Sequence, residues 1–292
     1  MSDCGHFAIS VITFIGSVFS PWYRWSGRKD PENHCCINVA LYGRGGRWTM
    51  TDRGKSALHQ TADRIDIGPS HVRWENGKLV LSINEMSWPH CQKIKGDIII
   101  EPSAMTKIEV PLKADGTHIW RPFAPTSAIK VRLNRQGWNW DGHGYFDANF
   151  GTAALEDDFD YWTWARLPHG DGTVCFYDVL DRQGQATEAA IRFDDLGNAS
   201  FFEAPPKQDM RRSLWLLKRE ARGDNGFRPR QVKQMLDAPF YCRSAIEADI
   251  EGERVVGVHE ALDLRRFASA FLKPMLAVKV PRIAKWHFAD RP

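Results

Sequence analysis

Short runs of alternating apolar and polar residues recur along this chain, and turn residues separate them. Alternation with a period of two is the pattern of a half-buried strand, and an Asn-Gly or Asp-Gly dipeptide between two runs favours a hairpin turn. Such dipeptides occur at Asn76-Gly77, Asp115-Gly116 and Asp171-Gly172. The clearest runs are residues 78–83, 97–101, 107–110, 128–133 and 173–177. This rhythm predicts an all-β fold of antiparallel strands, in a barrel or a sandwich.

Helical periodicity is confined to two places. It predicts a short helical turn over residues 231–238 and an amphipathic helix over residues 261–278, near the C-terminus. Basic residues are frequent among the apolar ones between residues 264 and 286. This segment fits either a helix that lies on an anionic membrane surface or a terminal helix that packs on the barrel with its charges solvated.

The length of 292 residues suits two domains. An acidic, turn-like run at residues 156–158 interrupts the strand rhythm, which starts afresh at Tyr161. We therefore expect a first β domain over residues 1–155, which carries the candidate site, and a second β domain over residues 156–292.

Composition limits the possible partners. The 39 Lys and Arg residues nearly balance the 36 Asp and Glu residues, so nucleic acid is not an expected partner. Six cysteines without a Cys-x-x-Cys spacing favour neither a zinc nor a disulfide framework. No apolar stretch reaches the ~20 residues that span a bilayer. Twelve tryptophans exceed ordinary usage, and their ring faces tolerate a cation.

Two short segments concentrate polar and aromatic residues at strand spacing, residues 117–122 and 142–151. Side chains alternate between the faces of a strand, so His118 and Trp120 share one face. By the same rule His143, Tyr145 and Asp147 share a face. If both faces line one pocket, the pocket holds a carboxyl, a phenol, imidazoles and an indole, which suffice for acid–base chemistry on an apolar substrate.

Other interpretations of these segments remain open. Gly142 and Gly144 could mark a bulge or a tight corner, and the aromatic residues could be barrel core. His118, His143 and Asp147 would make a two-histidine, one-carboxylate metal set, but no short-range ligand pair supports it.

Hydration of an unactivated alkene needs the groups that these segments offer. Protonation leaves a tertiary carbocation, so the enzyme needs a strong acid, electron-rich walls and a placed water. A carboxyl such as Asp147 in an apolar pocket stays protonated near neutral pH. The rings of Trp120 and Tyr145 can stabilise the cation, and His118 or Tyr145 can orient the water and accept its proton.

Longer motifs are spread over almost the whole chain. They are residues 14–21, 33–43, 47–51, 67–70, 118–122, 142–147, 161–166 and 257–260. In these motifs the chain closely resembles bacterial carotenoid 1,2-hydratases. The resemblance implies hydration of the terminal C1=C2 bond of an acyclic carotene, such as neurosporene or lycopene, without a cofactor or a metal. It also implies two lipocalin-like antiparallel β-barrels in tandem, to which the pattern adds a short C-terminal helix.

The functional set associated with this family is a His-x-Trp and a Tyr-x-Asp. These fall on His118 and Trp120, and on Tyr145 and Asp147, all matching in type and spacing. The resemblance gives Asp147 the role of proton donor, in agreement with the chemical argument.

Five further residues are expected to contact substrate: His143, Asn33, His34, Trp162 and Trp164. Asn33 and His34 could instead fix the end of a strand, and the two tryptophans could be interdomain core. His259 and Glu260 are expected to form a buried hydrogen-bonded pair.

Two other functions compete with hydration. A non-catalytic isoprenoid carrier needs only an apolar cavity and loses affinity by desolvating a carboxyl such as Asp147. An isoprenoid cyclase would share the acid but exclude water. Polar groups at His118, His143 and Tyr145 favour hydration. Because the substrate is a membrane lipid, we expect a cytoplasmic protein peripherally associated with the inner or photosynthetic membrane.

Overall fold

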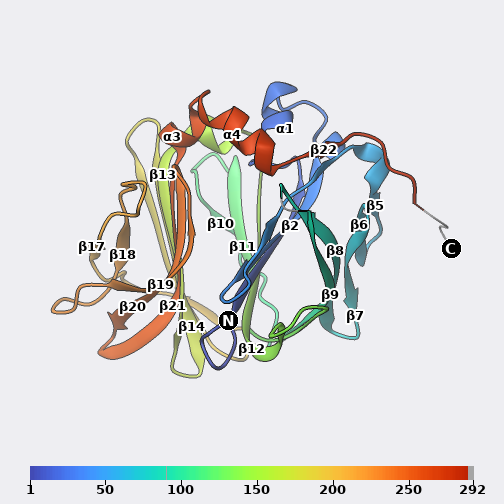
Figure 1. Ribbon diagram of the computed structural model, residues 1–292. Helices are drawn as coiled ribbons and strands as arrows, with labels where there is room; N and C mark the ends of the chain where they lie inside the picture. The colour runs from blue at the N-terminus through green and yellow to red at the C-terminus, as the bar shows by residue number, and fades with distance from the viewer. Residues whose placement is uncertain (90, 289–292) are drawn as a thin grey trace. The chain divides into compact units, whose positions relative to one another are not determined.

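The computed structural model describes residues 1–89 and 91–288, which are mostly β-strand, as predicted (Figure 1). The chain forms two compact units, each assembled from separate segments. Unit 1 comprises Met1–Pro102, Ser127–Gly144 and Ala270–Pro292, and unit 2 comprises Ser103–Thr126 and Tyr145–Ser269. These units interleave along the chain, whereas the expected division at residue 155 separates consecutive segments. That division into folding domains stays a prediction.

One sheet of unit 1 joins the two ends of the chain. Its strands are β1 (Ala8–Ile15), β2 (Cys35–Tyr42), β3 (Trp48–Thr49), β4 (Asp52–Arg53) and β22 (Arg282–Ile283). The order is β1-β2-β4-β22, and β3 also pairs with β2. All eight residues of β2 are buried, which is expected for an apolar strand covered on both faces.

The other strands of unit 1 form an antiparallel meander. They are β5 (Leu58–Gln60), β6 (Arg64–Ile67), β7 (Ser70–Glu75), β8 (Lys78–Ser87) and β9 (Gln92–Pro102). Asn76 and Gly77 join β7 to β8 with φ of 51° and 73°, so the predicted hairpin turn is confirmed. The long strands β11 (His118–Leu133) and β12 (Asn139–Gly151) pair with each other, and both have residues in both units.

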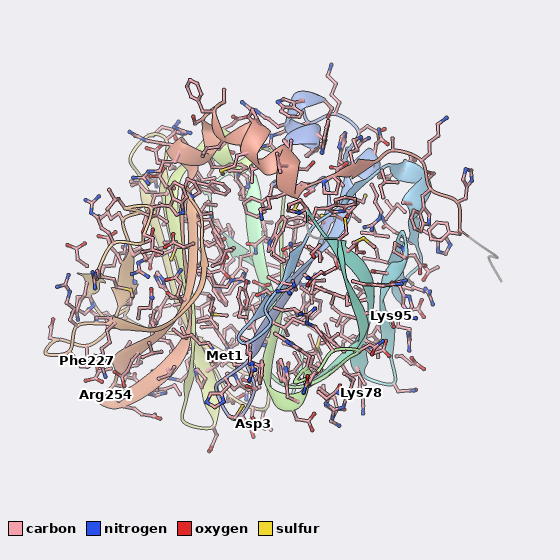
Figure 2. All side chains as sticks on the ribbon, in the orientation of Figure 1. Met1, Asp3, Lys78, Lys95, Phe227 and Arg254 are labelled. Carbon is pink, nitrogen blue, oxygen red and sulfur yellow. The ribbon has the colours of Figure 1, made fainter. Side chains whose placement is uncertain are left out.

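Unit 2 is built on a seven-stranded antiparallel sheet in the order β16-β15-β14-β13-β21-β20-β19. Its strands are β13 (Phe159–His169), β14 (Gly172–Asp181), β15 (Ala186–Phe193), β16 (Ala199–Phe201), β19 (Arg230–Asp237), β20 (Tyr241–Ile250) and β21 (Glu253–Asp263). Three short strands complete the unit: β10 (Val110–Pro111), which pairs with β11, and β17 (Lys207–Asp209) with β18 (Glu220–Arg222). Near the edge of the unit, the Arg254 guanidinium lies 4.1 Å from the centroid of the Phe227 ring (Figure 2).

Two expectations are corrected by this pairing. Residues 231–238 are mostly strand β19, because pairing with β20 overrides the local helical preference. The expected lipocalin-like barrels are open sheets in this structure. Among the described residues no pairing joins β16 to β19, so the seven-stranded sheet is not a closed barrel.

The two faces of the unit 2 sheet have different roles. One face carries an apolar cluster in which Ala165, Phe176 and Ile246 pack with Met210 and Ala221 from the β17–β18 region. Residues paired across antiparallel strands lie on the same face. On the opposite face the register therefore aligns four side chains in one row: Tyr177, Trp164, Glu260 and Arg243. This second face carries the candidate site.

Helices are short throughout. They are α1 (Pro21–Trp25), α2 (Leu155–Asp158), α3 (Leu264–Ala268) and α4 (Leu272–Lys279), with 3₁₀ turns at Pro31–Asn33 and Lys55–Ala57. The expected helix over residues 261–278 begins later, because β21 continues to Asp263, and it is present as two pieces, α3 and α4. The Asp263 side chain accepts a hydrogen bond from Arg266 N at 2.9 Å and caps α3. In the part of the chain that the structure describes, none of these helices has the length and apolar character to cross a bilayer.

The apolar face of the unit 2 sheet sets its stability. Leu167→Ala removes a fully buried side chain from this cluster and should lower the free energy of unfolding by about 3 kcal/mol. Leu180→Ala, in the same sheet but 37% exposed, is the matched control and should cost under about 1 kcal/mol. Denaturant titration of the full chain measures both, and equal losses would contradict the assignment of this face as the core.

Candidate active site

Three side chains of unit 2 meet around one carboxylate oxygen. Trp120 Nε1 on β11 and Tyr145 Oη on β12 each donate to Asp147 Oδ2 at 2.9 Å. Trp120 Nε1 also lies 3.1 Å from Tyr145 Oη, so the three groups close a triangle. Among the described residues, no group donates to the other oxygen, Oδ1. Three of the four residues of the predicted His-x-Trp and Tyr-x-Asp set are therefore in contact, and His118 is not part of this triangle.

The two donors leave a specific place for a proton. Oδ2 already accepts two hydrogen bonds, so a proton on neutral Asp147 belongs on Oδ1. Surrounding protein atoms remove water from the carboxyl and raise its pKa from 3.8 to about 6, although the bonds from Trp120 and Tyr145 oppose the shift. Burial, and then the charge of Asp147, raises the pKa of Tyr145 well above its ordinary value, so the phenol stays a neutral donor.

Aromatic rings surround this triangle. The ring of Tyr145 lies 5.1 Å from that of Trp164, and Trp120 lies 5.3 Å from Tyr177. Trp162 continues the set at 5.5 Å from Tyr177. The π-faces of such rings are electron-rich and can stabilise a cation. Trp162 and Trp164, expected as substrate contacts or interdomain core, are therefore parts of the same cluster as Asp147; their contact with substrate stays a prediction.

Two polar groups in this cluster lack partners. The indole N–H groups of Trp162 and Trp164 are buried and have no hydrogen-bond partner among the described residues. A buried N–H without a partner is costly, so such a group is a candidate to bind water or a ligand.

His118 is held by a carboxylate that is distant in sequence. Its Nε2 lies 2.8 Å from Asp158 Oδ2, and Asp158 Oδ1 accepts from Lys113 Nζ at 2.5 Å. Burial raises the pKa of Asp158, but the bonds from Lys113 and His118 outweigh it and the net shift is downward, so Asp158 is ionised. An ionised partner favours the proton on Nε2, which leaves Nδ1 as an acceptor. Gly151 gives the ring room, because a Cβ there would lie 2.8 Å from His118 Nδ1.

Glu260 and Arg243 form a buried ion pair on the face that carries the tryptophans, with Arg243 Nε 2.7 Å from Glu260 Oε1. Their charges act on Asp147 in opposite directions, because Glu260 raises its pKa and Arg243 lowers it. The predicted hydrogen bond between His259 and Glu260 is not formed. Neighbouring residues of a strand face opposite sides, and His259 Nε2 instead meets the Glu220 carbonyl at 2.7 Å.

The remaining predicted contacts belong to unit 1. Asn33 Oδ1 accepts from Lys55 N at 3.1 Å, and His34 Nδ1 lies 3.2 Å from the buried Asp52, which also pairs with Arg282. These bonds fix the start of β2, which agrees with the alternative that Asn33 and His34 fix the end of a strand. The backbone of His143 pairs with Met1, with His143 N donating to Met1 O at 3.0 Å. Substrate contact by Asn33, His34 or His143 stays a prediction.

Metal binding has no support in the described residues, where no group of three or more His, Cys, Asp or Glu side chains is placed to hold an ion. The alternative set of His118, His143 and Asp147 is therefore not formed.

Three residues of this site were not predicted from the sequence: Asp158, Tyr177 and Arg243. Asp158 lies in the acidic run that was interpreted as a domain boundary. Tyr177 is the last residue of a predicted strand. It lies two positions after the apolar Cys175 and so shares its face, which is the one signal that could have placed its ring inside the protein. Nothing local marks Arg243, since its role depends on pairing with Glu260 across two strands.

An all-β fold that surrounds a largely desolvated acid with aromatic rings defines a lipocalin-like protein equipped for acid chemistry on apolar molecules. The family model for carotenoid hydratase CrtC matches residues 11–289. The chain belongs to this family. It is 56% identical over 280 residues to the acyclic carotenoid 1,2-hydratase of Cereibacter sphaeroides, covering 96% of this chain and 100% of that protein. The corresponding hydratase of Rhodobacter capsulatus is 50% identical over 282 residues, with the same coverage.

Solved structures confirm the fold alone. A crystal structure of an AttH protein from Nitrosomonas europaea matches with a TM-score of 0.61 at 14% identity, covering 90% of this chain and 89% of that one. The crystal structure of CghA with Sch210972 matches with a TM-score of 0.51 at 13% identity, covering 89% and 85%.

The hydrogen bond from Tyr145 can be tested by its effect on the acid. Tyr145→Phe removes one donor that favours the carboxylate, so the pKa of Asp147 should rise further above about 6. Infrared titration of the carboxyl C=O band measures this. Tyr161→Phe is the matched control, because Tyr161 Oη donates to Lys218 O and not to Asp147. An unchanged pKa in Tyr145→Phe would contradict the geometry.

Proposed function

We propose that this chain adds water across the terminal C1=C2 double bond of acyclic carotenes of the neurosporene or lycopene type, giving 1-hydroxy carotenoids. The observation that carries the proposal is Asp147, an acid with a pKa raised to about 6 that is held by two donors among aromatic rings. The names of the relatives, acyclic carotenoid 1,2-hydratases at 56% and 50% identity, support the substrate class.

In the first step Asp147 Oδ1 gives its proton to C2, and the electron pair of the double bond forms the new C–H bond. A tertiary cation remains at C1. The hydrogen bonds from Trp120 and Tyr145 stabilise the carboxylate that forms, which makes the desolvated acid strong enough to react. Each well-placed ring face stabilises the cation by roughly 0.5–2 kcal/mol.

In the second step a water molecule attacks C1. The indole N–H of Trp164 has no partner among the residues that the structure describes, and its ring neighbours Tyr145. This N–H group is suited to hold the water oxygen while a lone pair remains for the new C–O bond. His118 accepts the released proton on Nδ1, with Asp158 as the positioning residue that binds Nε2. A donor for water beside the acid favours hydration over cyclisation, and over a carrier that would gain nothing from a desolvated carboxyl.

The balanced reaction is alkene plus water giving alcohol, and it transfers no electrons. After turnover His118 releases the proton that it took from water to the solvent, and Asp147 takes one proton from the solvent, so both residues return to their starting states. Because no oxidant or reductant is consumed, we propose that the enzyme works without a cofactor. Because the substrate dissolves in lipid, we also propose that the protein acts from the cytoplasm as a peripheral protein of the inner or photosynthetic membrane.

Labelled water tests the reaction. The purified chain is incubated with lycopene or neurosporene in detergent, in water enriched in oxygen-18 and without added cofactor, and the products are analysed by mass spectrometry. A product one water heavier that carries the label is expected. Unchanged carotene bound to the protein would favour the carrier, and an isomer of unchanged mass would favour the cyclase; either would overturn the hydratase.

Asp147→Asn keeps the shape of the side chain but removes the acidic proton. Hydration should fall by about 10²–10⁴-fold, the usual contribution of a positioned general acid. Carotenoid binding, measured by co-elution, should persist. Asp141→Asn changes an exposed residue on the same strand, where Asp141 pairs with Arg132, and should leave turnover unchanged. Near-normal turnover in Asp147→Asn would show that another group donates the proton.

The activity should depend on pH through the same carboxyl. Only neutral Asp147 can donate, so kcat/KM should fall about tenfold per pH unit well above the pKa of Asp147 of about 6. Because this pKa is raised on folding, the neutral carboxyl stabilises the fold below its ordinary pKa of 3.8, and this contribution is lost as the pH rises through about 6. Asp147→Asn should lack that loss in thermal melts at several pH values. A kcat/KM that rises as the pH increases above the pKa of Asp147 would contradict the acid role of this residue.

A further inference from the structure

The loop between β17 and β18 in unit 2 exposes three consecutive apolar side chains. Leu214 is 87% exposed, Trp215 is 52% exposed and Leu216 is 63% exposed. On either side of this tip, Met210 and Leu217 are buried and anchor the loop. Scattered apolar side chains are common on protein surfaces, but three adjacent ones at an anchored tip form a patch that a partner can use.

The backbone of the tip is already hydrogen-bonded within the protein. Leu214 N donates to Asp237 Oδ2 at 2.8 Å. Trp215 N donates to Ser213 Oγ at 3.2 Å, and Leu216 N donates to Ser213 O at 3.0 Å. Leu216 has φ of 58°, a left-handed conformation that a leucine rarely adopts. The turn is therefore held in a fixed shape, with its N–H groups satisfied.

Arginines bind the carbonyls of the same tip. Arg266 donates to Trp215 O at 2.8 Å, and Arg212 donates to Leu216 O at 3.3 Å. Backbone groups that enter a lipid environment must be hydrogen-bonded internally, because no water is available there. This tip meets that condition at its N–H groups and at these two carbonyls.

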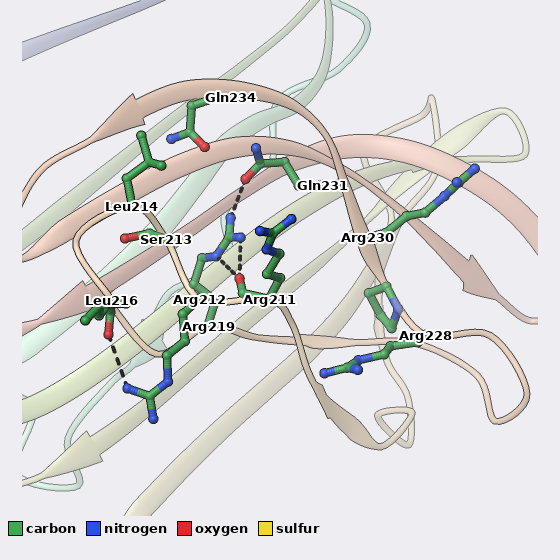
Figure 3. A pocket seen from close by; sticks show the side chains of 11 residues that line it. Arg211, Arg212, Ser213, Leu214, Leu216, Arg219, Arg228, Arg230, Gln231 and Gln234 are labelled. Carbon is green, nitrogen blue, oxygen red and sulfur yellow. Dashed lines mark hydrogen bonds between the residues drawn. The ribbon is translucent and has the colours of Figure 1, made fainter.

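A basic pocket of about 740 Å³ lies beside the tip (Figure 3). Leu214 and Leu216 belong to its lining, and no acidic residue is among the described residues that line it. Five arginines line it: Arg211, Arg212, Arg219, Arg228 and Arg230. Figure 3 shows Arg219 bound to Gln231 and to the Arg211 carbonyl, which fixes the floor of the pocket. Such a pocket attracts anionic phosphate groups.

We propose that the loop of residues 211–216 docks this protein on an anionic lipid bilayer, with the Leu214–Trp215–Leu216 tip inserted among the lipids and the arginines on lipid phosphates. Leucine and tryptophan beside arginine is the composition of segments that lie in a membrane interface. The inference deepens the proposed function, because a carotene must be drawn from a bilayer, but lipid binding is measurable without any carotene.

A lipid surface fits this loop better than a protein partner does. A stable protein interface covers about 800 Å² on each side, which three side chains cannot supply. The loop also fits better than the C-terminal segment that the sequence suggested. In that segment Arg265 pairs with Asp160 within unit 2, and Arg282 pairs with Asp52 within unit 1. Beside the loop Arg230 pairs with Glu247, but among the described residues Arg211 and Arg212 have no acidic partner.

Vesicle binding tests the proposal. The full chain is sedimented with vesicles of phosphatidylcholine alone, or with about one third phosphatidylglycerol, without carotene. Wild type should prefer the anionic vesicles, less so at high salt. The combined variant Leu214→Ser, Trp215→Ser, Leu216→Ser should bind about tenfold more weakly or worse. Arg211→Gln with Arg212→Gln should lose about fivefold for each arginine, on anionic vesicles only.

Two controls separate this loop from other exposed apolar residues. Leu196→Ser with Phe201→Ser changes exposed side chains elsewhere in unit 2 and should leave binding unchanged. Phe271→Ser changes the C-terminal segment, where Phe271 is also exposed, and should have little effect. The tip variant should keep wild-type thermal stability and wild-type hydration of carotene in detergent, while it loses hydration of carotene in vesicles.

Three results would overturn the inference. One is wild-type protein that binds no vesicles, which would direct the search to a protein partner. A second is a tip variant that binds like wild type while Phe271→Ser does not. A third is binding that depends on the arginines alone and is displaced by inorganic phosphate, which would indicate a soluble anion. Vesicle binding by a chain that hydrates nothing would support the loop and overturn only the proposed reaction.

Discussion

The two hydrogen bonds that Trp120 and Tyr145 donate to one oxygen of Asp147 are the interaction on which the site depends. Desolvation alone would make the carboxyl too weak an acid to protonate an alkene, and full hydration would leave it ionised at neutral pH. The two donors balance these effects at a pKa of about 6 and leave Oδ1 for the proton. Charge around the acid is balanced in the same way, because Glu260 and Arg243 shift its pKa in opposite directions.

The sheet of unit 2 makes this arrangement possible, because one of its faces forms the apolar core and the other carries the site. Residues such as Phe176 pack into the apolar cluster on one face, and their strand neighbours, such as Tyr177, turn rings toward Asp147 on the other. Rigid strands thus place the aromatic groups, while the stability of the unit rests on residues that never meet the site. A face with a buried ion pair, and with two indole N–H groups that have no partner among the described residues, is costly for folding, as is typical of functional sites.

Local alternation was enough to predict the all-β fold, the Asn76-Gly77 turn and the shared face of Tyr145 and Asp147, which are hydrogen-bonded. Contacts that depend on long-range pairing were beyond it. Asp158 reaches His118 from 40 residues away, and Arg243 meets Glu260 only through the register of β20 and β21. Residues 231–238 became strand because a neighbouring strand was available, and the open edges of the sheets, like the interleaving of the two units, have no local signal.

We propose that a carboxyl proton passes from Asp147 to carbon before water adds. Turnover of an acyclic carotene in heavy water, followed by mass spectrometry and NMR of the alcohol, tests it most directly. If Asp147 donates the proton, each hydrated end should carry one deuterium bonded to C2, and the rate should be several times lower than in ordinary water, since the transferred proton is exchangeable. An alcohol with no deuterium on carbon would contradict proton donation by Asp147, because C2 would then have gained its hydrogen from a source other than an exchangeable acid.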